Sequence, residues 1–242
     1  MIQIIRPYKI PTLAHFWVLL LAFICHRSAM ANDKGAVQLG VGFGEIPFMS
    51  DSLKPALSFG YFVTDQAMVN FIYQGEDTIQ RDEESYNTEF GWQGLRSSRE
   101  SVGRRLMLQG RYYFLKSQGL YLSTGMVYGG GDVEIMDFDA RQRSLAGEAI
   151  SGSYRFHVER RAALRPAVGL GFERTLTSGL SVFSDFTMDF FHQTPKPHVT
   201  IETGDHLSSV QRQQLRSQIQ EHYRDNFHNR YHQFNLGIGY RY

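Results

Sequence analysis

Apolar and polar residues alternate along eight separate stretches of the chain. In the first, the odd positions from Val37 to Phe43 are apolar, whereas Gln38, Gly40 and Gly42 stand between them. A period of two residues is typical of a β-strand whose two faces meet different surroundings. The same pattern returns at residues 57–63, 69–74, 106–114, 120–128, 164–172, 180–190 and 234–242. We therefore expect eight strands.

The connections between these strands alternate in length. Short turns at 64–66, 116–119 and 177–179 join strands two to three, four to five and six to seven. The other connections are polar and mostly long, at about residues 76–101, 136–160 and 193–230, with a shorter one near 46–53. This layout predicts an all-β fold, a closed antiparallel up-and-down transmembrane β-barrel with short periplasmic turns and long extracellular loops. A soluble β-sandwich is the alternative, but it must bury its apolar face against a second sheet.

The amino terminus has the three-part layout of a secretory signal peptide. Arg6 and Lys9 precede an apolar stretch at 16–25, and small residues stand at Ala29 and Ala31. About ten apolar residues are too few for a membrane-spanning helix, which needs roughly 20. We expect residues 1–31 to be a cleaved signal peptide for the general secretory pathway, and residues 32–242 to form the barrel domain.

Composition excludes several classes of protein. The chain is 42% hydrophobic with a net charge of only +1, which argues against a disordered chain and against a nucleic-acid binder held by bulk positive charge. Its single cysteine, Cys25, excludes an intramolecular disulfide and any CxxC site. We therefore expect no nucleic-acid partner and no cofactor.

Several strand and turn sequences resemble those of a known superfamily. They are Gly60 to Asp65 (GYFVTD), Val69 to Phe71, Arg111 to Phe114 (RYYF), Pro166 to Phe172 (PAVGLGF) and Asn235 to Tyr242 (NLGIGYRY). They are similar to the strand blocks of the small bacterial outer-membrane barrels, the superfamily that holds the transmembrane domains of outer membrane proteins A, X and W. The resemblance implies an integral outer-membrane location, and the terminal aromatic strand resembles the signal recognised by the barrel assembly machinery.

The polar faces of the strands predict a charged barrel interior. Eight strands enclose a space that side chains can fill, and buried charges need partners. We expect ion pairs within the lumen, formed by Arg105, Arg111, Arg165 and Arg241 with Glu173, Asp185 and Asp189. Paired glycines on the same faces, such as Gly169 with Gly171, leave room in a narrow barrel. A plugged barrel with a structural or surface-interaction role follows, and a narrow porin-like channel for small or apolar solutes is the alternative.

Arginines in the long connections suggest a phosphate-binding surface. Arg96, Arg99 and Arg104 lie where lipopolysaccharide phosphates would surround the barrel, and guanidinium groups suit phosphate geometry. A solvated surface of mixed charge is the alternative. Residues 208–223 also show helical spacing after Ser208 and Ser209, which predicts a capped amphipathic helix against the rim or the lipopolysaccharide layer.

Enzymatic and metal-binding interpretations have weaker support. A lipid A deacylase would use a His and a Ser two residues apart on a strand, but His206 and Ser208 lie in the last long connection. Without a positioned base the hydroxyl is not activated, so we expect no catalytic site. Six histidines gather at residues 192–232, where Glu202 or Asp225 could complete a metal shell. Their scattered spacing does not establish a site, and we expect no metal.

Overall fold

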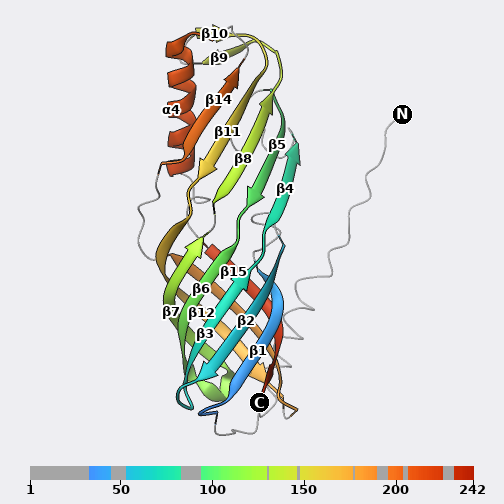
Figure 1. The fold of residues 1–242 in the computed structure, drawn as a ribbon, viewed down its shortest axis with the longest axis vertical. Helices are drawn as coiled ribbons and strands as arrows, with labels where there is room; N and C mark the ends of the chain where they lie inside the picture. Colours follow the sequence, from blue (N-terminus) through green and yellow to red (C-terminus); the bar gives the residue numbers. More distant parts are fainter. Residues whose placement is uncertain are drawn as a thin grey trace, which may run out of the picture.

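The computed structural model describes residues 33–44, 53–82, 94–129, 131–145, 148–176, 178–189, 196–203, 207–225 and 232–242 (Figure 1). The expected signal peptide and the connection near residues 46–52 lie outside these ranges. Within them the chain forms a barrel, a second sheet that continues from one end of the barrel, and one helix beside that sheet. Figure 1 shows the barrel in the lower half and the second sheet in the upper half.

The barrel is closed and antiparallel, with the strand order β1-β15-β13-β12-β7-β6-β3-β2. All eight strands expected from the sequence are confirmed. Closure depends on β1, which pairs on one side with β2 and on the other with the carboxy-terminal strand β15. The strands are Val37–Gly44 (β1), Lys54–Phe62 (β2), Ala67–Gln74 (β3), Arg105–Leu115 (β6), Leu120–Gly129 (β7), Ala163–Thr175 (β12), Leu180–Asp189 (β13) and His232–Arg241 (β15).

The apolar face of each barrel strand points outward. Val41, Leu57 and Leu108 are each more than half exposed, whereas Gln38 and Asn70 on the inward face are buried. A soluble protein buries such an apolar face, so this arrangement excludes the β-sandwich alternative. The expected assignment of the two faces is confirmed.

Short turns close one end of the barrel, which we call the turn end. In the β2–β3 turn the N–H of Val63 donates to the carbonyl oxygen of Ala67 at 2.9 Å. The β6–β7 turn contains the 3₁₀ helix η1 (Lys116–Gln118) and then Gly119, whose φ of +76° favours glycine. In the β12–β13 turn the N–H of Gly179 donates to Leu176. The three expected short turns are confirmed, apart from Thr177, which lies outside the described residues.

The expectation that the long connections are loops is wrong. At the opposite end, the distal end, they form a five-stranded sheet of order β14-β11-β8-β5-β4, which we call the distal sheet. Its strands are Asp77–Asp82 (β4), Leu95–Val102 (β5), Asp132–Phe138 (β8), Tyr154–Arg160 (β11) and His198–Thr203 (β14), and a small ribbon adds Arg143–Leu145 (β9) and Glu148–Ile150 (β10).

The distal sheet was missed because its strands carry charged residues on one face and are short. Alternation is present, since Met136 and Phe138 on β8 and Phe156 and Val158 on β11 are buried. Yet β5 has apolar residues only at its two ends, Leu95 and Val102. Charged residues that separate a few apolar residues occur both in short strands and in polar loops. Periodicity alone therefore did not distinguish a strand from a loop here.

The predicted helix is present as α4 (Ser209–Asp225), and its first turn is capped as expected. The hydroxyl of Ser208 accepts from the N–H of Gln211 at 3.2 Å, and the side-chain oxygen of Gln211 accepts from the N–H of Ser208 at 2.9 Å. This reciprocal pair is a capping box. Among the described residues, no helix is both long enough and apolar enough to cross a bilayer.

The expected position of α4 against the rim is wrong, whereas its expected contact with the lipopolysaccharide layer stays a prediction. Its buried residues Leu215 and Ile219 belong to one apolar cluster with Leu95, Phe156 and Val199 of the distal sheet. In Figure 1 the helix lies beside β14. The cause is the sheet itself, because its apolar face needs a cover and α4 supplies it.

We predict that Leu215→Ala weakens the distal sheet and leaves the barrel intact. Deleting a buried leucine side chain costs about 2–5 kcal/mol, and Leu215 is 5% exposed. Hydrogen exchange of the β11 and β14 amides should therefore accelerate, while the barrel amides stay protected. Val210→Ala on the exposed side of α4 is the matched control, because Val210 is 58% exposed. Equal exchange in both variants contradicts the packing of α4 on the sheet.

Candidate functional site

The candidate site is the lumen of the barrel, where the inward faces of four strands bring charged side chains together. Arg111 comes from β6, Glu173 from β12, Asp185 from β13 and Asn235 from β15, and all four are at most 4% exposed. Each lies on the polar face of an alternating strand, and closure of the barrel turns that face inward. The lumen therefore contains full charges out of reach of solvent.

Arg111 is the centre of this network. Its Nη2 donates to Asp185 Oδ2 at 2.7 Å, and its Nη1 lies 3.7 Å from Glu173 Oε2. Its guanidinium carbon lies 4.6 Å from the centre of the Tyr121 ring, a cation–π contact. When the amides of Asn70 and Gln109 are oriented to satisfy both their oxygen and nitrogen atoms, both oxygens also accept from Arg111, at 2.7–2.9 Å.

Toward the turn end the network continues through Arg241. Its guanidinium forms ion pairs with Glu173 and with Asp33, the latter at 2.9 Å, and it stacks 4.3 Å from the Phe62 ring centre. Lys116 Nζ lies 3.1 Å from the other carboxylate oxygen of Asp33. Three cationic groups thus face three carboxylates along one path, because Arg111, Arg241 and Lys116 pair with Asp185, Glu173 and Asp33.

Tyrosines fix the carboxylates from the side. The Tyr113 hydroxyl donates to Glu173 Oε2 at 2.9 Å, and the Tyr121 hydroxyl lies 3.2 Å from Asp185 Oδ2. The two rings pack with centroids 5.1 Å apart, beside Phe62 and Met68. Gly171 makes this arrangement possible, because any side chain there would overlap the Tyr121 ring.

Toward the distal end the side chains inside the lumen are first neutral amides and then, farther along, charged pairs. Asn235 Nδ2 donates to Asp185 Oδ1 at 2.7 Å, and Asn235 Oδ1 accepts from Gln74 at 2.9 Å and from Gln233 at 2.8 Å. Beyond these amides, Arg165 lies 3.2 Å from Asp189. At the junction with the distal sheet Arg105 lies 3.7 Å from Asp132.

The seven residues expected in the lumen fall into two groups. The structure brings Arg111, Glu173, Asp185 and Arg241 into one network. It places Arg165 with Asp189, and Arg105 with Asp132, nearer the distal end. Whether either group serves a function beyond holding the barrel together stays a prediction.

Sequence reasoning missed Asp33, Lys116, Tyr113 and Tyr121 as members of the network. The tyrosines carried a usable signal, because Tyr113 lies two residues from Arg111 and Tyr121 alternates with Leu120 and Leu122. Asp33 and Lys116 lie just outside their strands, where no periodicity constrains the direction of a side chain.

The residues expected to face lipopolysaccharide lie at the distal end. Arg96 and Arg99 are exposed on β5. Arg104 lies between β5 and β6 and pairs with Glu76 at 2.7 Å, and this hydrogen bond raises the pKa of Arg104 above its usual value.

Of the histidines expected in the last connection, His198 lies on β14, and His206 and His228 lie outside the described residues. Within the described part of the chain no three potential metal ligands come together.

Comparison with known proteins identifies the fold and nothing finer. No protein-family model matches the chain, and no curated protein sequence matches it. Among solved structures, CarO2 of Acinetobacter baumannii superimposes with a TM-score of 0.55 at 13% identity, covering 86% of this chain and 98% of that one. CarO of the same organism gives 0.52 at 12% identity, covering 85% and 97%. This chain shares its fold with CarO. At such low identity the likeness extends to the fold alone, and the lumen must be interpreted from its own residues.

We predict that Arg111→Met destabilises the barrel by about 3–5 kcal/mol, the usual cost of removing one partner of a buried charge network. Asp185 loses its closest cation in this variant, while the size of the side chain is nearly kept. Unfolding by guanidinium in detergent, followed by heat-modifiable gel mobility, measures the change. Arg99→Met is the control, and we expect it to stay within about 0.5 kcal/mol of the wild type because Arg99 is exposed. Equal stability of the two variants contradicts the central role of Arg111.

Proposed function

We propose that the chain is an integral protein of the bacterial outer membrane whose barrel anchors an extracellular sheet and helix, and whose role is structural or surface-interactive. The observation that carries this proposal is the filled lumen, in which buried ion pairs occupy the path that a pore would need. The folded part outside the barrel supports it, because an ordered sheet with its own apolar core provides a surface for contacts.

The membrane location rests on the outer wall of the barrel. The outward faces of β1, β2 and β6 carry rows of apolar side chains, among them Val41, Leu57 and Leu108. Such a continuous apolar wall is unstable in water and stable in hydrocarbon. Tyr240 and Tyr242 lie at the turn end with ring centroids 5.9 Å apart, in the position of an interfacial aromatic girdle.

Several further features of the proposal rest on the sequence. The layout of residues 1–31 supports export through the general secretory pathway with cleavage after Ala31. The terminal aromatic strand, ending at Tyr242, supports insertion by the barrel assembly machinery. The proposed role involves no enzymatic activity, no nucleic acid and no cofactor. Its immediate partners are membrane lipid and lipopolysaccharide. The distal sheet is the surface on which a further ligand would bind.

A narrow channel is the second candidate, because some lumen groups lack protein partners. Within the described lumen, Gln74 Oε1, Gln233 Oε1 and Thr187 Oγ1 are buried and accept no hydrogen bond from the protein. Buried polar atoms of this kind normally bind water. Water on the distal side of Asn235 would be the beginning of a path, and the Arg111 network would be its barrier.

We predict that the wild-type barrel gives no discrete conductance steps in planar bilayers. Arg111→Ser combined with Asp185→Ser removes a cation with its anion, and we expect steps to appear because the barrier is removed without leaving a net charge. Arg165→Ser with Asp189→Ser is the matched control, since it removes a pair outside the central network. Reproducible wild-type steps would favour the channel instead, and a silent double variant that still inserts would contradict the plug.

We predict that changing Arg96, Arg99 and Arg104 together to serine weakens lipopolysaccharide binding. Arg104→Ser alone should have the smaller effect, because Arg104 is already paired with Glu76, whereas Arg96 and Arg99 have exposed guanidinium groups. Binding of purified lipopolysaccharide to barrels in nanodiscs, measured at two salt concentrations, gives the readout. Unchanged binding by the triple variant contradicts a phosphate-binding role and favours a solvated surface.

A further inference from the structure

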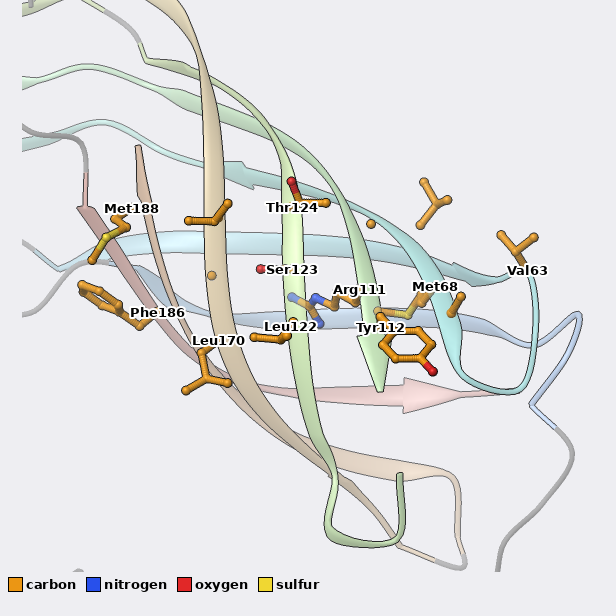
Figure 2. Close-up of a pocket in the computed structure, with 15 residues that line it drawn as sticks. Val63, Met68, Arg111, Tyr112, Leu122, Ser123, Thr124, Leu170, Phe186 and Met188 are labelled. Atoms are coloured by element: carbon orange, nitrogen blue, oxygen red, sulfur yellow. The ribbon is translucent and has the colours of Figure 1, made fainter. Parts of the chain in front are cut away.

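The outer wall of the barrel contains a hollow of about 840 Å³ that the packing of the barrel does not require. It crosses five adjacent strands, β3, β6, β7, β12 and β13. Figure 2 shows Val63 and Tyr112 at one end of it and Phe186 and Met188 at the other. The floor is a row of small outward residues on neighbouring strands, in which Gly110 pairs with Thr124 and Thr124 with Val168. A row of larger residues borders it, with Tyr112, Leu122 and Leu170 paired in the same way.

Gly110 is the residue that opens the hollow. A methyl group at this position would contact only the carbonyl oxygen of Thr124, 3.9 Å away. At Gly171, in contrast, a side chain would overlap Tyr121 inside the lumen. Glycine in a strand interior is unfavourable compared with residues that fill the pleat. Because neither backbone conformation nor packing requires glycine at 110, its structural effect is the open space on the membrane-facing side.

The hollow runs obliquely up the barrel wall from the turn end. It begins at Val63, beside the β2–β3 turn, and reaches Met188, the ninth of the ten residues of β13 counted from the turn end. Four steps between strands give a length of about 19 Å. With strands tilted by about 40°, Met188 lies about 21 Å above the turn end of β13, in an apolar band about 25 Å tall. The hollow therefore runs obliquely from the turn-end interface past the middle of the bilayer, and its lower part lies in the leaflet at the turn end.

The hollow itself is apolar, and a pair of polar side chains lies beside its lower end. The Tyr112 hydroxyl lies 3.4 Å from Gln66 Oε1, next to the β2–β3 turn. The exposed atoms deeper in the hollow come from Leu122, Leu170, Phe186 and Met188. A phospholipid has the same distribution, because its headgroup stays at the interface and one acyl chain enters the hydrocarbon. The turn end faces the periplasmic leaflet in the proposed topology, and phospholipid fills that leaflet.

We propose that this hollow binds one acyl chain of a phospholipid from the periplasmic leaflet, with the headgroup beside Tyr112 and Gln66. The site rests on the proposed membrane location and goes beyond it, because it assigns a defined lipid to one sector of the barrel wall. Lipid elsewhere around the barrel exchanges over a convex surface, whereas the chain in the hollow lies along a row of large side chains formed by Tyr112, Leu122 and Leu170.

The test uses the complete mature barrel in liposomes that contain phosphatidylethanolamine with a photoreactive group in one acyl chain. After illumination, mass spectrometry maps the labelled peptides. We expect label to concentrate on β6, β7 and β12 in the wild type. In the Gly110→Phe, Thr124→Phe variant, label there should fall about tenfold, since losing contact with about two methylene groups already changes binding by that factor.

Val41→Phe with Ile238→Phe is the matched control. These residues pair on β1 and β15, are more than half exposed, and lie outside the hollow. The control variant should label like the wild type. Both variants add apolar surface on the lipid side, so both should still float with the liposomes and keep heat-modifiable mobility.

The failures are distinguishable. Barrels that float but carry label evenly around the wall, or that label equally in both variants, overturn the lipid site and leave the proposed membrane location intact. Wild-type barrels that migrate as dimers in detergent, when the Gly110→Phe, Thr124→Phe variant migrates as a monomer, also overturn it, because a second copy then occupies the hollow. Wild-type chain that fails to float overturns the membrane location and the lipid site together.

Discussion

Closure of the sheet between β1 and β15 is the constraint on which the rest of the structure depends. Along this seam Leu39 pairs with Tyr240 and Val41 with Ile238, so the first and last strands of the barrel complete each other's hydrogen bonds. In hydrocarbon an unpaired strand edge costs several kcal/mol for each exposed polar group, so only a closed sheet is stable there. Once the sheet closes, alternation has a single outcome, with one set of side chains outside and the other confined in a narrow interior.

Confinement explains the chemistry of the lumen. Eight strands leave space that side chains must fill, and here they fill it with charges whose partners come from distant parts of the chain. Arg111 and Asp185 are 74 residues apart, and Arg241 and Glu173 are 68 residues apart. Each charge is tolerated because the opposite strand supplies its counterion. The same pairing ties together strands that have no backbone contact, since β6 is joined to β13 and β12 to β15 inside the lumen.

The distal sheet follows from continuation of the barrel strands. β3 leads into β4, β5 into β6, β7 into β8, β11 into β12 and β13 into β14, each with a break of a few residues, the longest lying before β14. Five strands continue in this way, so the extension is an open sheet instead of a second barrel. An open sheet with one apolar face needs a cover, and the return from β14 to β15 provides it as α4. The distal sheet and α4 therefore form a folded unit at the distal end of the barrel.

The sequence by itself determined the eight barrel strands, the closed fold, the short turns and the capped start of α4. It did so because period-two alternation and serines ahead of a helical spacing, here Ser208 and Ser209, are local signals in the sequence. Only the tertiary structure decided which charges meet, that Tyr113 and Tyr121 join them, and that polar connections form a sheet under α4. Those features depend on strand register and on distances across the barrel, and no local pattern encodes the distance between residues that closure brings together.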